Sequence, residues 1–424
     1  MDKLLVHGGT PIHGAITISG SKNASLPILA ASLLTEEDVV IRRVPDVSDT
    51  NYMVQILTGL GADVERFSGT VRITADKISD TAPYDIVRRM RASVCMMGPL
   101  LARMHRCVVA LPGGCVIGDR PIDLHIRGLE ALGATSEFDG GNVILSAPNG
   151  LNGATIDLCG ENGPTVLGTD NVMMAATLAQ GITTITSAAC EPEVVDLADF
   201  LNSMGAKITG AGTPVITIEG VEKLHGTVHN VIPDRIEAGT FMVAAALAGE
   251  GVTLRRVHEG HLVAITSALR KAGHQVHFND SGDACTVHRG DTPMPVEIVT
   301  EPYPGYPTDM QAQMTALFAL TPGTSMVVDT IFPQRFMHCA ELKRMGADVH
   351  VSDGKAVIKG VEGLSGAPVM ASDLRASAAL VLAGLVAKGT TEINRLYHID
   401  RGYEHIDEKL LALGANVERV RVKA

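Results

Sequence analysis

The sequence has 424 residues, of which 46% are apolar and 19% are charged, so it is long and apolar enough for two or three domains with sizeable cores. A formal net charge of −12 and an aromatic content of 3% disfavour nucleic acid as a partner, because phosphates attract basic residues and bases stack on aromatic rings. No apolar run is long enough to span a bilayer, the first residues lack a signal-peptide pattern, and the seven scattered cysteines are typical of free thiols, so we expect a cytoplasmic protein that does not use a membrane.

A short phrase recurs six times, with a period of about 70 residues. It consists of Gly, a small residue, a polar residue and a β-branched residue, and its copies begin at Gly61, Gly133, Gly205, Gly273, Gly346 and Gly414. Each copy ends a helical pattern and starts a strand, with Gly as the natural helix C-cap. Six copies predict two triplets of one structural unit, or one ring, and a cleft between two triplets would suit a large polar substrate.

The first and last repeats show the predicted elements most clearly. In the first, residues 25–27 open a helix, 39–41 form a strand, 46–50 form a loop and cap, and a second helix runs to residue 60. In the last, the corresponding segments are a helix from 372, a turn and strand at 389–393, a loop at 394–403, a second helix at 406–413 and a strand at 416–420. The first helix of each repeat is apolar on nearly all sides and should be buried, whereas the second should lie outside. The pattern therefore predicts an inside-out α/β fold.

Polar and charged residues stand out at two equivalent positions of the repeat. The first position is the head of the buried helix, with Lys22, Asn23, Arg91, Asp234, Arg235, Asp309 and Arg375. The second position is the loop before the outer helix, with Asp49, Arg120, Glu193, Arg335 and Arg401. Because helix N-termini and cations attract anions, the pattern predicts a site for a phosphorylated or polycarboxylated small ligand. Any single Arg is better explained as a solvated cap or surface ion pair. Six cations at equivalent positions weaken that explanation, namely Lys22, Arg91, Arg120, Arg335, Arg375 and Arg401.

A Gly-rich segment at residues 111–121 contains Cys115 and predicts a mobile loop. A cysteine in such a loop, close to Arg120, can serve as a nucleophile or a general acid. The remaining cysteines lie in apolar or strand-like contexts and are expected to be inert, namely Cys95, Cys107, Cys159, Cys190, Cys285 and Cys339. His258 and His261 have helical ligand spacing without an evident third ligand, and no nucleotide-cofactor motif is present, so neither a metal nor a cofactor is expected.

Several stretches in this order resemble one known family over essentially the full length. They are residues 19–24, 111–115, 120–125, 307–313 and 398–404. The chain resembles the UDP-N-acetylglucosamine 1-carboxyvinyltransferases, a family of enolpyruvyl transferases of peptidoglycan synthesis. The resemblance implies two inside-out α/β domains of three repeats each, the first at residues 22–232 and the second at residues 1–21 with 233–424.

The resemblance also implies the chemistry. In that family the enolpyruvyl group of phosphoenolpyruvate moves to the 3′-hydroxyl of UDP-N-acetylglucosamine and phosphate is released, as the first committed step of peptidoglycan synthesis. Cys115 matches the residue that protonates the methylene carbon and can form a covalent adduct, and Asp309 matches the residue that takes the hydroxyl proton. Groups that match the phosphoenolpyruvate site are Lys22, Arg120 and Arg401. Groups that match the nucleotide-sugar site are Arg91, Arg120, Pro121, Ile122, Asp123, Leu124, Asp309 and Ile331.

Asn23, Arg335 and Arg375 complete the predicted substrate site, because they stand at the same repeat positions as the matched residues. No obligatory protein partner is evident. The chain departs from the family at residues 165–169, where Leu167 replaces a Gly that lets the backbone approach the ligand. Three alternatives remain. The first is the sister enzyme 5-enolpyruvylshikimate-3-phosphate synthase, which lacks the Cys loop. The second is a transferase that uses another nucleotide acceptor, and the third is a non-catalytic repeat scaffold.

Overall fold

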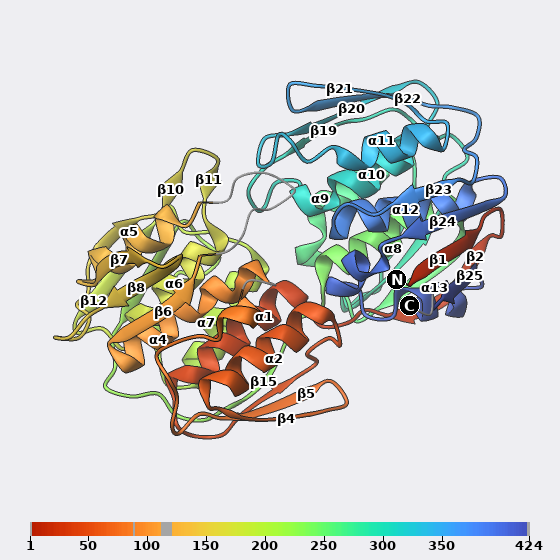
Figure 1. Cartoon of the computed structure of the whole chain (residues 1–424). Coiled ribbons are helices and arrows are strands. Elements are labelled where there is room, and N and C mark those ends of the chain that lie inside the picture. Colours follow the sequence, from red (N-terminus) through yellow and green to blue (C-terminus); the bar gives the residue numbers. More distant parts are fainter. Residues whose placement is uncertain (1, 88–89, 112–120, 422–424) are drawn as a thin grey trace. The chain divides into compact units, whose positions relative to one another are not determined.

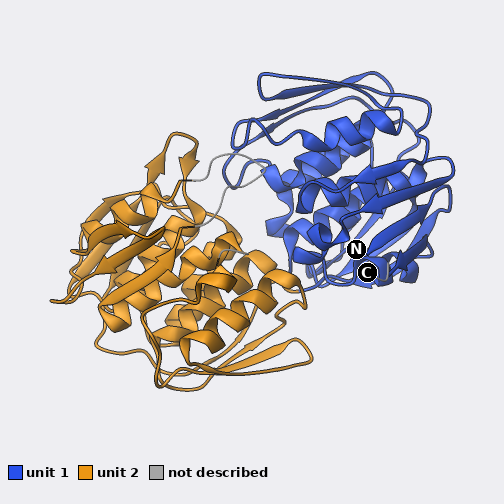
Figure 2. Cartoon of the chain, viewed as in Figure 1, with its two compact units in different colours: residues 1–19, 116–118, 233–424 blue, residues 20–115, 119–232 orange. Residues whose placement is uncertain are grey.

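The computed structural model describes residues 2–87, 90–111 and 121–421, and Figure 1 shows the course of the chain. These residues divide into two compact units, which Figure 2 colours separately. Unit 1 comprises residues 2–19 and 233–421, and unit 2 comprises residues 20–87, 90–111 and 121–232. Within the described ranges, none of the helices has the length and hydropathy that a membrane crossing requires.

Unit 2 contains three consecutive copies of one α/β repeat. The first consists of α1 (Lys22–Ala31), η1 (Ser32–Leu34), β3 (Val39–Arg42), α2 (Ser48–Leu60), β4 (Asp63–Phe67) and β5 (Thr70–Thr74). The second consists of α3 (Tyr84–Val87), η2 (Arg91–Met96), α4 (Met97–Met104), β6 (Arg106–Ala110), α5 (Asp123–Ala131), β7 (Thr135–Asp139) and β8 (Asn142–Ser146). The third consists of β9 (Thr155–Asp157), β10 (Cys159–Gly160), β11 (Gly163–Pro164), α6 (Val166–Ala176), β12 (Ile182–Thr186), α7 (Pro192–Ser203), β13 (Lys207–Thr209) and β14 (Val215–Glu219), and it is followed by β15 (Val228–Asn230).

Unit 1 begins with β1 (Lys3–His7) and β2 (Ile12–Thr17) and continues with three further copies. The fourth consists of α8 (Arg235–Ala248), β16 (Gly249–Arg255), η3 (Glu259–His261), α9 (Val263–Lys271), β17 (Gln275–Phe278) and β18 (Ala284–His288). The fifth consists of β19 (Glu297–Thr300), η4 (Thr308–Met310), α10 (Gln311–Phe318), β20 (Thr324–Asp329), α11 (Met337–Arg344), β21 (Asp348–Ser352) and β22 (Lys355–Lys359). The sixth consists of β23 (Pro368–Met370), α12 (Leu374–Val386), β24 (Thr390–Asn394), η5 (Leu396–Arg401), α13 (Ile406–Ala412) and β25 (Asn416–Val420).

The six predicted glycines end the six outer helices. Each has a positive φ, from +86° at Gly414 to +106° at Gly61, a conformation that costs Gly no clash with a Cβ atom. A strand follows each of them: β4, β7, β13, β17, β21 or β25. The prediction of six helix-to-strand turns is therefore confirmed.

One sheet belongs to each repeat. In the fifth repeat the strand order is β19-β20-β22-β21, with β19 parallel to β20 and the other pairs antiparallel. In unit 2, β15 from the end of the third repeat pairs in parallel with β3 of the first. In unit 1, the N-terminal strand β1 lies between β24 and β25, with Val6 opposite both Thr391 and Val417. The first strand of the chain therefore completes the sheet of the last repeat.

The first helix of each repeat is buried, as its apolar sequence predicts. Every residue of α12 from Arg375 to Leu385 is buried, and α8 and α10 are buried along nearly their whole length. The outer helices are buried on one side only, as α9 shows with Ile265, Thr266, Ala268 and Leu269 inside. Figure 1 shows α8, α10 and α12 in the interior of unit 1, with sheets and outer helices around them. This confirms the inside-out α/β arrangement.

Three segments differ from the prediction. Helix α1 begins at Lys22 rather than at Ser25, because the Ser21 side chain accepts a hydrogen bond from the backbone N–H of Ala24 and caps the helix there. Pro27 consequently lies inside the helix instead of in its first turn. The expected loop at 394–403 contains the short helix η5, and the expected loop at 46–50 already enters α2 at Ser48.

Candidate active site

Asp309 lies in η4 at the head of the buried helix α10, where its carboxylate meets two guanidinium groups of unit 1. Nη1 of Arg335 lies 2.8 Å from Oδ1 of Asp309, and Nη2 of Arg375 lies 2.9 Å from Oδ2. The Asp309 side chain is 28% exposed, while those of Arg335 and Arg375 are 7% and 3% exposed. Two charge-assisted hydrogen bonds thus orient a carboxylate that still reaches solvent.

Each of the two guanidinium groups also lies over an aromatic ring. Arg335 is 5.9 Å from the ring centroid of Phe332, and Arg375 is 5.3 Å from that of Tyr403. Burial lowers the pKa of Arg375, but Asp309, Tyr403 and Asp234 together outweigh it and raise the pKa above its ordinary value. Arg375 therefore remains charged, and the cluster of Asp309, Arg335 and Arg375 keeps its cationic surroundings at every physiological pH.

Asp329 holds the backbone around Ile331 and the helix head next to Asp309. It is the last residue of β20, is 1% exposed, and accepts hydrogen bonds from the backbone N–H groups of Ile331 (3.1 Å) and Phe332 (2.8 Å). Its other oxygen accepts from the hydroxyl of Thr308 at 2.7 Å, and that hydroxyl in turn lies 3.2 Å from Nη1 of Arg335. Two residues of the predicted site, Ile331 and Asp309, are therefore fixed through one buried carboxylate.

Arg401 ends η5, the short helix that precedes α13, and its side chain is partly exposed. The same loop carries Tyr403, which contacts Arg375. Burial, with a contribution from Arg401, lowers the pKa of His398 in this loop, so that His398 is neutral near pH 7. Unit 1 thus joins Asp309, Arg335 and Arg375 directly and joins the Arg401 loop to them through Tyr403.

In unit 2, Lys22 and Asn23 are the first two residues of the buried helix α1. Nζ of Lys22 lies 3.2 Å from Oδ2 of Asp49, which is in the first turn of the neighbouring helix α2. Asp49 was expected in a loop and instead belongs to that helix. Because the positive end of the α1 dipole adds to the ammonium charge, Lys22 gives this helix head an anion-attracting character.

Arg91 begins η2 and leads into the buried helix α4, and its side chain is partly exposed. Residues 121–124 lead into α5, with Pro121 and Asp123 exposed and Ile122 and Leu124 partly buried. Helix α5 is anchored by His125, which is buried and contacts the Asn171 side chain of α6 at 2.8 Å. Cys115 and Arg120 lie outside the described residues.

The departure at residues 165–169 falls at the head of α6. Thr165 caps the helix by accepting from the backbone N–H of Gly168 at 3.2 Å. Leu167 lies in the first turn, has no positive φ, and packs partly buried against the core of unit 2. Since any residue adopts this helical conformation, the backbone at this position does not require Gly.

Asp170 follows in the same helix and was not predicted as a special residue. It is 2% exposed, and its Oδ1 has no hydrogen-bond partner in the described part of the chain. Burial, together with the nearby carboxylates of Glu191 and Glu193, raises the pKa of Asp170 well above its ordinary value. The fold therefore favours the protonated form of this carboxyl group. Only the fold could reveal this, because the burial and the two acidic neighbours come from tertiary packing.

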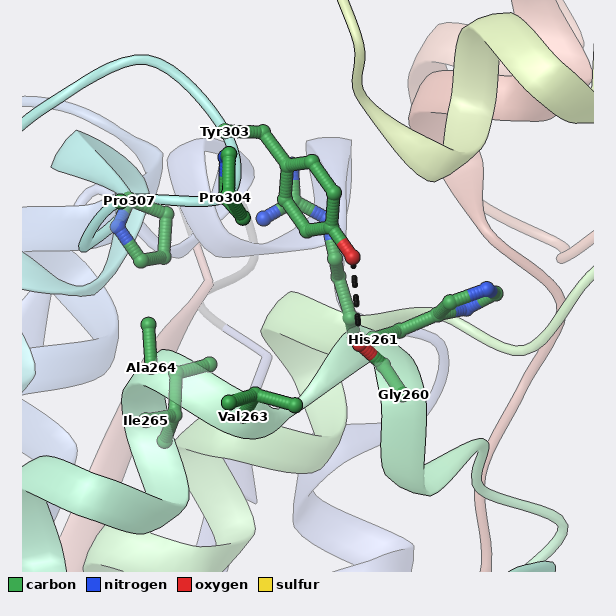
Figure 3. Close-up of a pocket in the computed structure, with 10 residues that line it drawn as sticks. Gly260, His261, Val263, Ala264, Ile265, Tyr303, Pro304 and Pro307 are labelled. Atoms are coloured by element: carbon green, nitrogen blue, oxygen red, sulfur yellow. Dashed lines mark hydrogen bonds between the residues drawn. The ribbon is translucent and has the colours of Figure 1, made fainter. Parts of the chain in front are cut away.

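A small cavity of about 160 Å³ lies in unit 1 between the start of α9 and the loop at 303–307 (Figure 3). Arg235 lies 5.5 Å from the ring centroid of Tyr303, whose hydroxyl donates to the carbonyl of Gly260 at 3.1 Å. The lining contains neither Asp309 nor any of the three arginines at 335, 375 and 401. Sites for small molecules usually have volumes of about 300–1,000 Å³, so this cavity alone does not accommodate a nucleotide sugar.

His258 and His261, considered above as metal ligands, stack on each other beside this cavity with ring centroids 4.0 Å apart. Burial lowers the pKa of His261 to about 4, with smaller contributions from His258 and Arg235. Across residues 2–87, 90–111 and 121–421, no three His, Cys, Asp or Glu side chains are grouped as metal binding would require.

Residues 6–410 match the family model of EPSP synthase (3-phosphoshikimate 1-carboxyvinyltransferase). The UDP-N-acetylglucosamine 1-carboxyvinyltransferase of Akkermansia muciniphila is 71% identical over 420 residues, covering 99% of this chain and 99% of the relative. The enzyme of the same name from Methylacidiphilum infernorum is 57% identical over 423 residues, covering 100% of both chains. The chain belongs to the UDP-N-acetylglucosamine 1-carboxyvinyltransferase family.

Solved structures agree with this family's fold. The enolpyruvyl transferase NikO from Streptomyces tendae matches with a TM-score of 0.89 and 25% identity, covering 100% of this chain and 99% of that one. EPSP synthase from Acinetobacter baumannii matches with a TM-score of 0.76 and 19% identity, covering 99% of this chain and 100% of that one. The second likeness concerns the fold alone, so it lends no support to the sister enzyme as the function of this chain.

Sequence reasoning missed Asp329, Tyr403, Gln313 and Thr240 as contributors to the site. Three of them, Thr240, Gln313 and Asp329, are polar residues in helices or strands that are otherwise apolar. A buried polar residue in such a segment needs a hydrogen-bond partner, so its presence in an apolar segment could have marked it as a special residue in the sequence. The identity of the partners was not available: those of Thr240 and Gln313 include residues of other repeats, and Asp329 meets Thr308 of its own repeat only through the folding of the chain.

Proposed function

We propose that this chain transfers the enolpyruvyl group of phosphoenolpyruvate to the 3′-hydroxyl of UDP-N-acetylglucosamine with release of phosphate. The reaction would take place in the cytoplasm as the first committed step of peptidoglycan synthesis. The observation that carries the proposal is the Asp309 carboxylate, partly exposed at a helix head and oriented by Arg335 and Arg375. Full-length identity of 71% with a UDP-N-acetylglucosamine 1-carboxyvinyltransferase supports the choice of acceptor.

The first step adds the sugar hydroxyl across the double bond of phosphoenolpyruvate. Asp309 accepts the hydroxyl proton as the oxygen bonds to the carbon that bears the phosphate, and Cys115 delivers a proton to the methylene carbon, which becomes a methyl group. In the second step phosphate leaves, the methyl group gives up a proton, and the double bond forms again. The proton lost from the methyl group replaces the one that Cys115 gave, and the hydroxyl proton leaves with the phosphate, so the overall transfer balances.

Phosphoenolpyruvate is a multiply charged anion, so the proposed site needs fixed cations. Lys22 supplies one from the head of α1, where Asp49 orients its ammonium group. Arg401 and Arg120 supply the others, and Asn23 adds an amide beside Lys22. A preorganised cationic cradle stabilises the charge that develops on the phosphate as it leaves.

The resemblance assigns the acceptor to Arg91, residues 120–124, Asp309 and Ile331. Arg335 and Arg375 are included because their guanidinium groups contact the carboxylate of Asp309. Asp329 supports this assignment, because it fixes the backbone N–H of Ile331 and the helix head at Thr308 together. A transferase for another nucleotide acceptor is less well supported, because Leu167 adopts an ordinary helical conformation and packs, partly buried, against the core of unit 2.

Phosphate release tests the proposal. The protein is incubated with phosphoenolpyruvate and, in parallel, UDP-N-acetylglucosamine, other UDP-sugars, other nucleotides and shikimate 3-phosphate. We expect release with UDP-N-acetylglucosamine and a product that is heavier by one enolpyruvyl group. Phosphate release only with another nucleotide would establish the alternative acceptor. Release with shikimate 3-phosphate would establish the sister reaction. No release with any acceptor would support the non-catalytic scaffold.

A further inference from the structure

The guanidinium group of Arg375 is buried, and among the described residues only its Nη2 has a hydrogen-bond partner. The residue is 2% exposed, and its Nη2 donates to Asp309 at 2.9 Å. Its Nε and Nη1 are also buried, and no hydrogen-bond partner for either lies within the described ranges. The face of the Tyr403 ring, 5.3 Å from the guanidinium carbon, is therefore a principal contact that fixes the plane of this group.

Tyr403 is itself fixed by two hydrogen bonds in the interior of unit 1. It is 2% exposed, and its hydroxyl lies 2.8 Å from the hydroxyl of Thr240 on α8 and 3.3 Å from Nε2 of Gln313 on α10. Thr240 donates its own proton to the carbonyl of Ile236 at 2.8 Å, so the Tyr403 hydroxyl must be the donor to Thr240. Burial raises the pKa of Tyr403, which keeps that proton in place.

The same network returns to Asp309. Nε2 of Gln313 lies 2.9 Å from the backbone carbonyl of Asp309, in addition to its contacts with Thr240 and Tyr403. Tyr403 thus connects the buried helices α8 and α10 with Arg375 on α12. It is linked to Asp309 by two routes, through the guanidinium of Arg375 to the carboxylate and through Gln313 to the backbone.

We propose that Tyr403 is a positioning residue for the proton acceptor: by supporting Arg375, it holds the Asp309 carboxylate in the orientation that accepts the proton of the sugar hydroxyl. The inference rests on the proposed role of Asp309. Tyr403 does not touch the substrate in this scheme and acts through Arg375. A Tyr that served only as packing would contribute to stability and leave turnover alone, so the two roles predict different measurements.

The experiment compares Tyr403→Leu, Tyr403→Phe and Thr240→Val with the wild type. Tyr403→Leu removes the ring. Tyr403→Phe keeps the ring and removes both of its hydrogen bonds, and Thr240→Val keeps the ring and removes the bond to Thr240. Tyr306→Phe is the matched control, because Tyr306 is also buried in unit 1, lies three residues from Asp309, and directs its hydroxyl at the carbonyl of Met310, at 3.5 Å. Turnover, both KM values, the melting temperature and the rate of covalent labelling by fosfomycin are measured for each protein.

We expect kcat to fall about 10²-fold in Tyr403→Leu, which is the usual effect of displacing a reacting group by about 1 Å, and about tenfold in Tyr403→Phe and Thr240→Val. KM for phosphoenolpyruvate and the labelling rate should stay within about twofold of the wild type, because neither depends on the base. KM for UDP-N-acetylglucosamine should change less than kcat does, because Arg375 also belongs to the proposed acceptor site. Tyr306→Phe should match the wild type in turnover.

Unchanged kcat in Tyr403→Phe and Thr240→Val, with an active wild type, would overturn the inference and leave the proposed function intact. A fall in labelling that parallels the fall in kcat would also overturn it, because the whole site would then be disturbed. If Tyr403→Leu does not fold, the other two variants decide. A wild type without any transferase activity would instead refute the proposed function, and the inference with it.

Discussion

Lys22 and Asp49 form an ion pair between the first turns of two neighbouring helices, with Nζ 3.2 Å from Oδ2 and side chains that are 13% and 4% exposed. Because the Lys22 side chain is largely buried, the carboxylate of Asp49 holds its ammonium group in one orientation. The ammonium group is therefore oriented before a substrate anion binds. If Lys22 binds phosphoenolpyruvate as proposed, Asp49 should support that binding by orienting the ammonium group.

Asp49→Asn should raise KM for phosphoenolpyruvate about tenfold, which corresponds to about 1.4 kcal/mol and to the loss of one charge-assisted hydrogen bond. KM for UDP-N-acetylglucosamine should change little. Asp46→Asn is the control, because Asp46 lies in the same segment with a side chain that is 58% exposed. Equal effects of the two substitutions would contradict the specific role of Asp49, and steady-state kinetics with each substrate varied separately decides between them.

Asp309→Asn should lower kcat by about 10²–10⁴-fold, because an amide keeps the shape of the carboxylate but does not accept a proton at neutral pH. Fosfomycin labelling of the protein should persist, since it depends on the thiol and not on the base. The experiment measures kcat and, separately, the mass of the protein after treatment with fosfomycin. A variant that retains more than a tenth of the wild-type kcat would remove Asp309 as the proton acceptor.

Cys115→Asp should retain part of the activity, because a carboxylic acid can also donate a proton, whereas Cys115→Ala should lose about 10²–10⁴-fold. Neither variant should gain mass with fosfomycin. Cys159→Ser is the control, because Cys159 is the exposed cysteine among the described ones. Cys159→Ser should bind one molecule of fosfomycin, as the wild type does. If Cys159→Ser is not labelled, Cys159 rather than Cys115 is the reactive thiol.

Leu167→Gly should lower KM for UDP-N-acetylglucosamine, because it restores the small residue that lets the backbone approach the uridine. It should also destabilise the protein by about 1 kcal/mol or more, since Gly replaces a good helix former in α6. Leu167→Ala separates the effects, because it shortens the side chain and keeps the helix propensity. A higher KM in both variants would show that Leu167 itself contacts the acceptor, and binding and melting measurements test the two effects independently.

Asp170→Asn should make the protein more stable near pH 8. The pKa of Asp170 in the folded state is raised above its unfolded value of 3.8, so the folded state binds more protons and loses stability as the pH rises above that value. The amide mimics the protonated acid and removes this loss, which amounts to about 1.4 kcal/mol for each unit of pKa elevation. Urea unfolding at pH 5 and pH 8 measures the free energy of unfolding of both proteins. If this free energy changes with pH equally in the wild type and in Asp170→Asn, the prediction is wrong.

Local sequence signals were sufficient for the repeat. A Gly that follows a helical pattern adopts a positive φ at little cost, so Gly61 and Gly414 marked the same turn in repeats far apart in the chain. Helix α12 was predicted to be buried because its apolar residues leave no polar face. The start of α1 was predicted three residues late, because a side-chain cap such as that of Ser21 depends on one hydrogen bond and not on a periodic pattern.

The same distinction between local and tertiary information holds for the candidate site. The sequence by itself determined which cations and acids stand at helix heads, because equivalent positions of a repeat are readable from its period. Only the tertiary structure decided that Arg335 and Arg375 meet the carboxylate of Asp309, and that Tyr403 lies under Arg375. The partners come from two repeats of unit 1, and the distance between buried helices of different repeats is set by how their side chains pack, which no local pattern records.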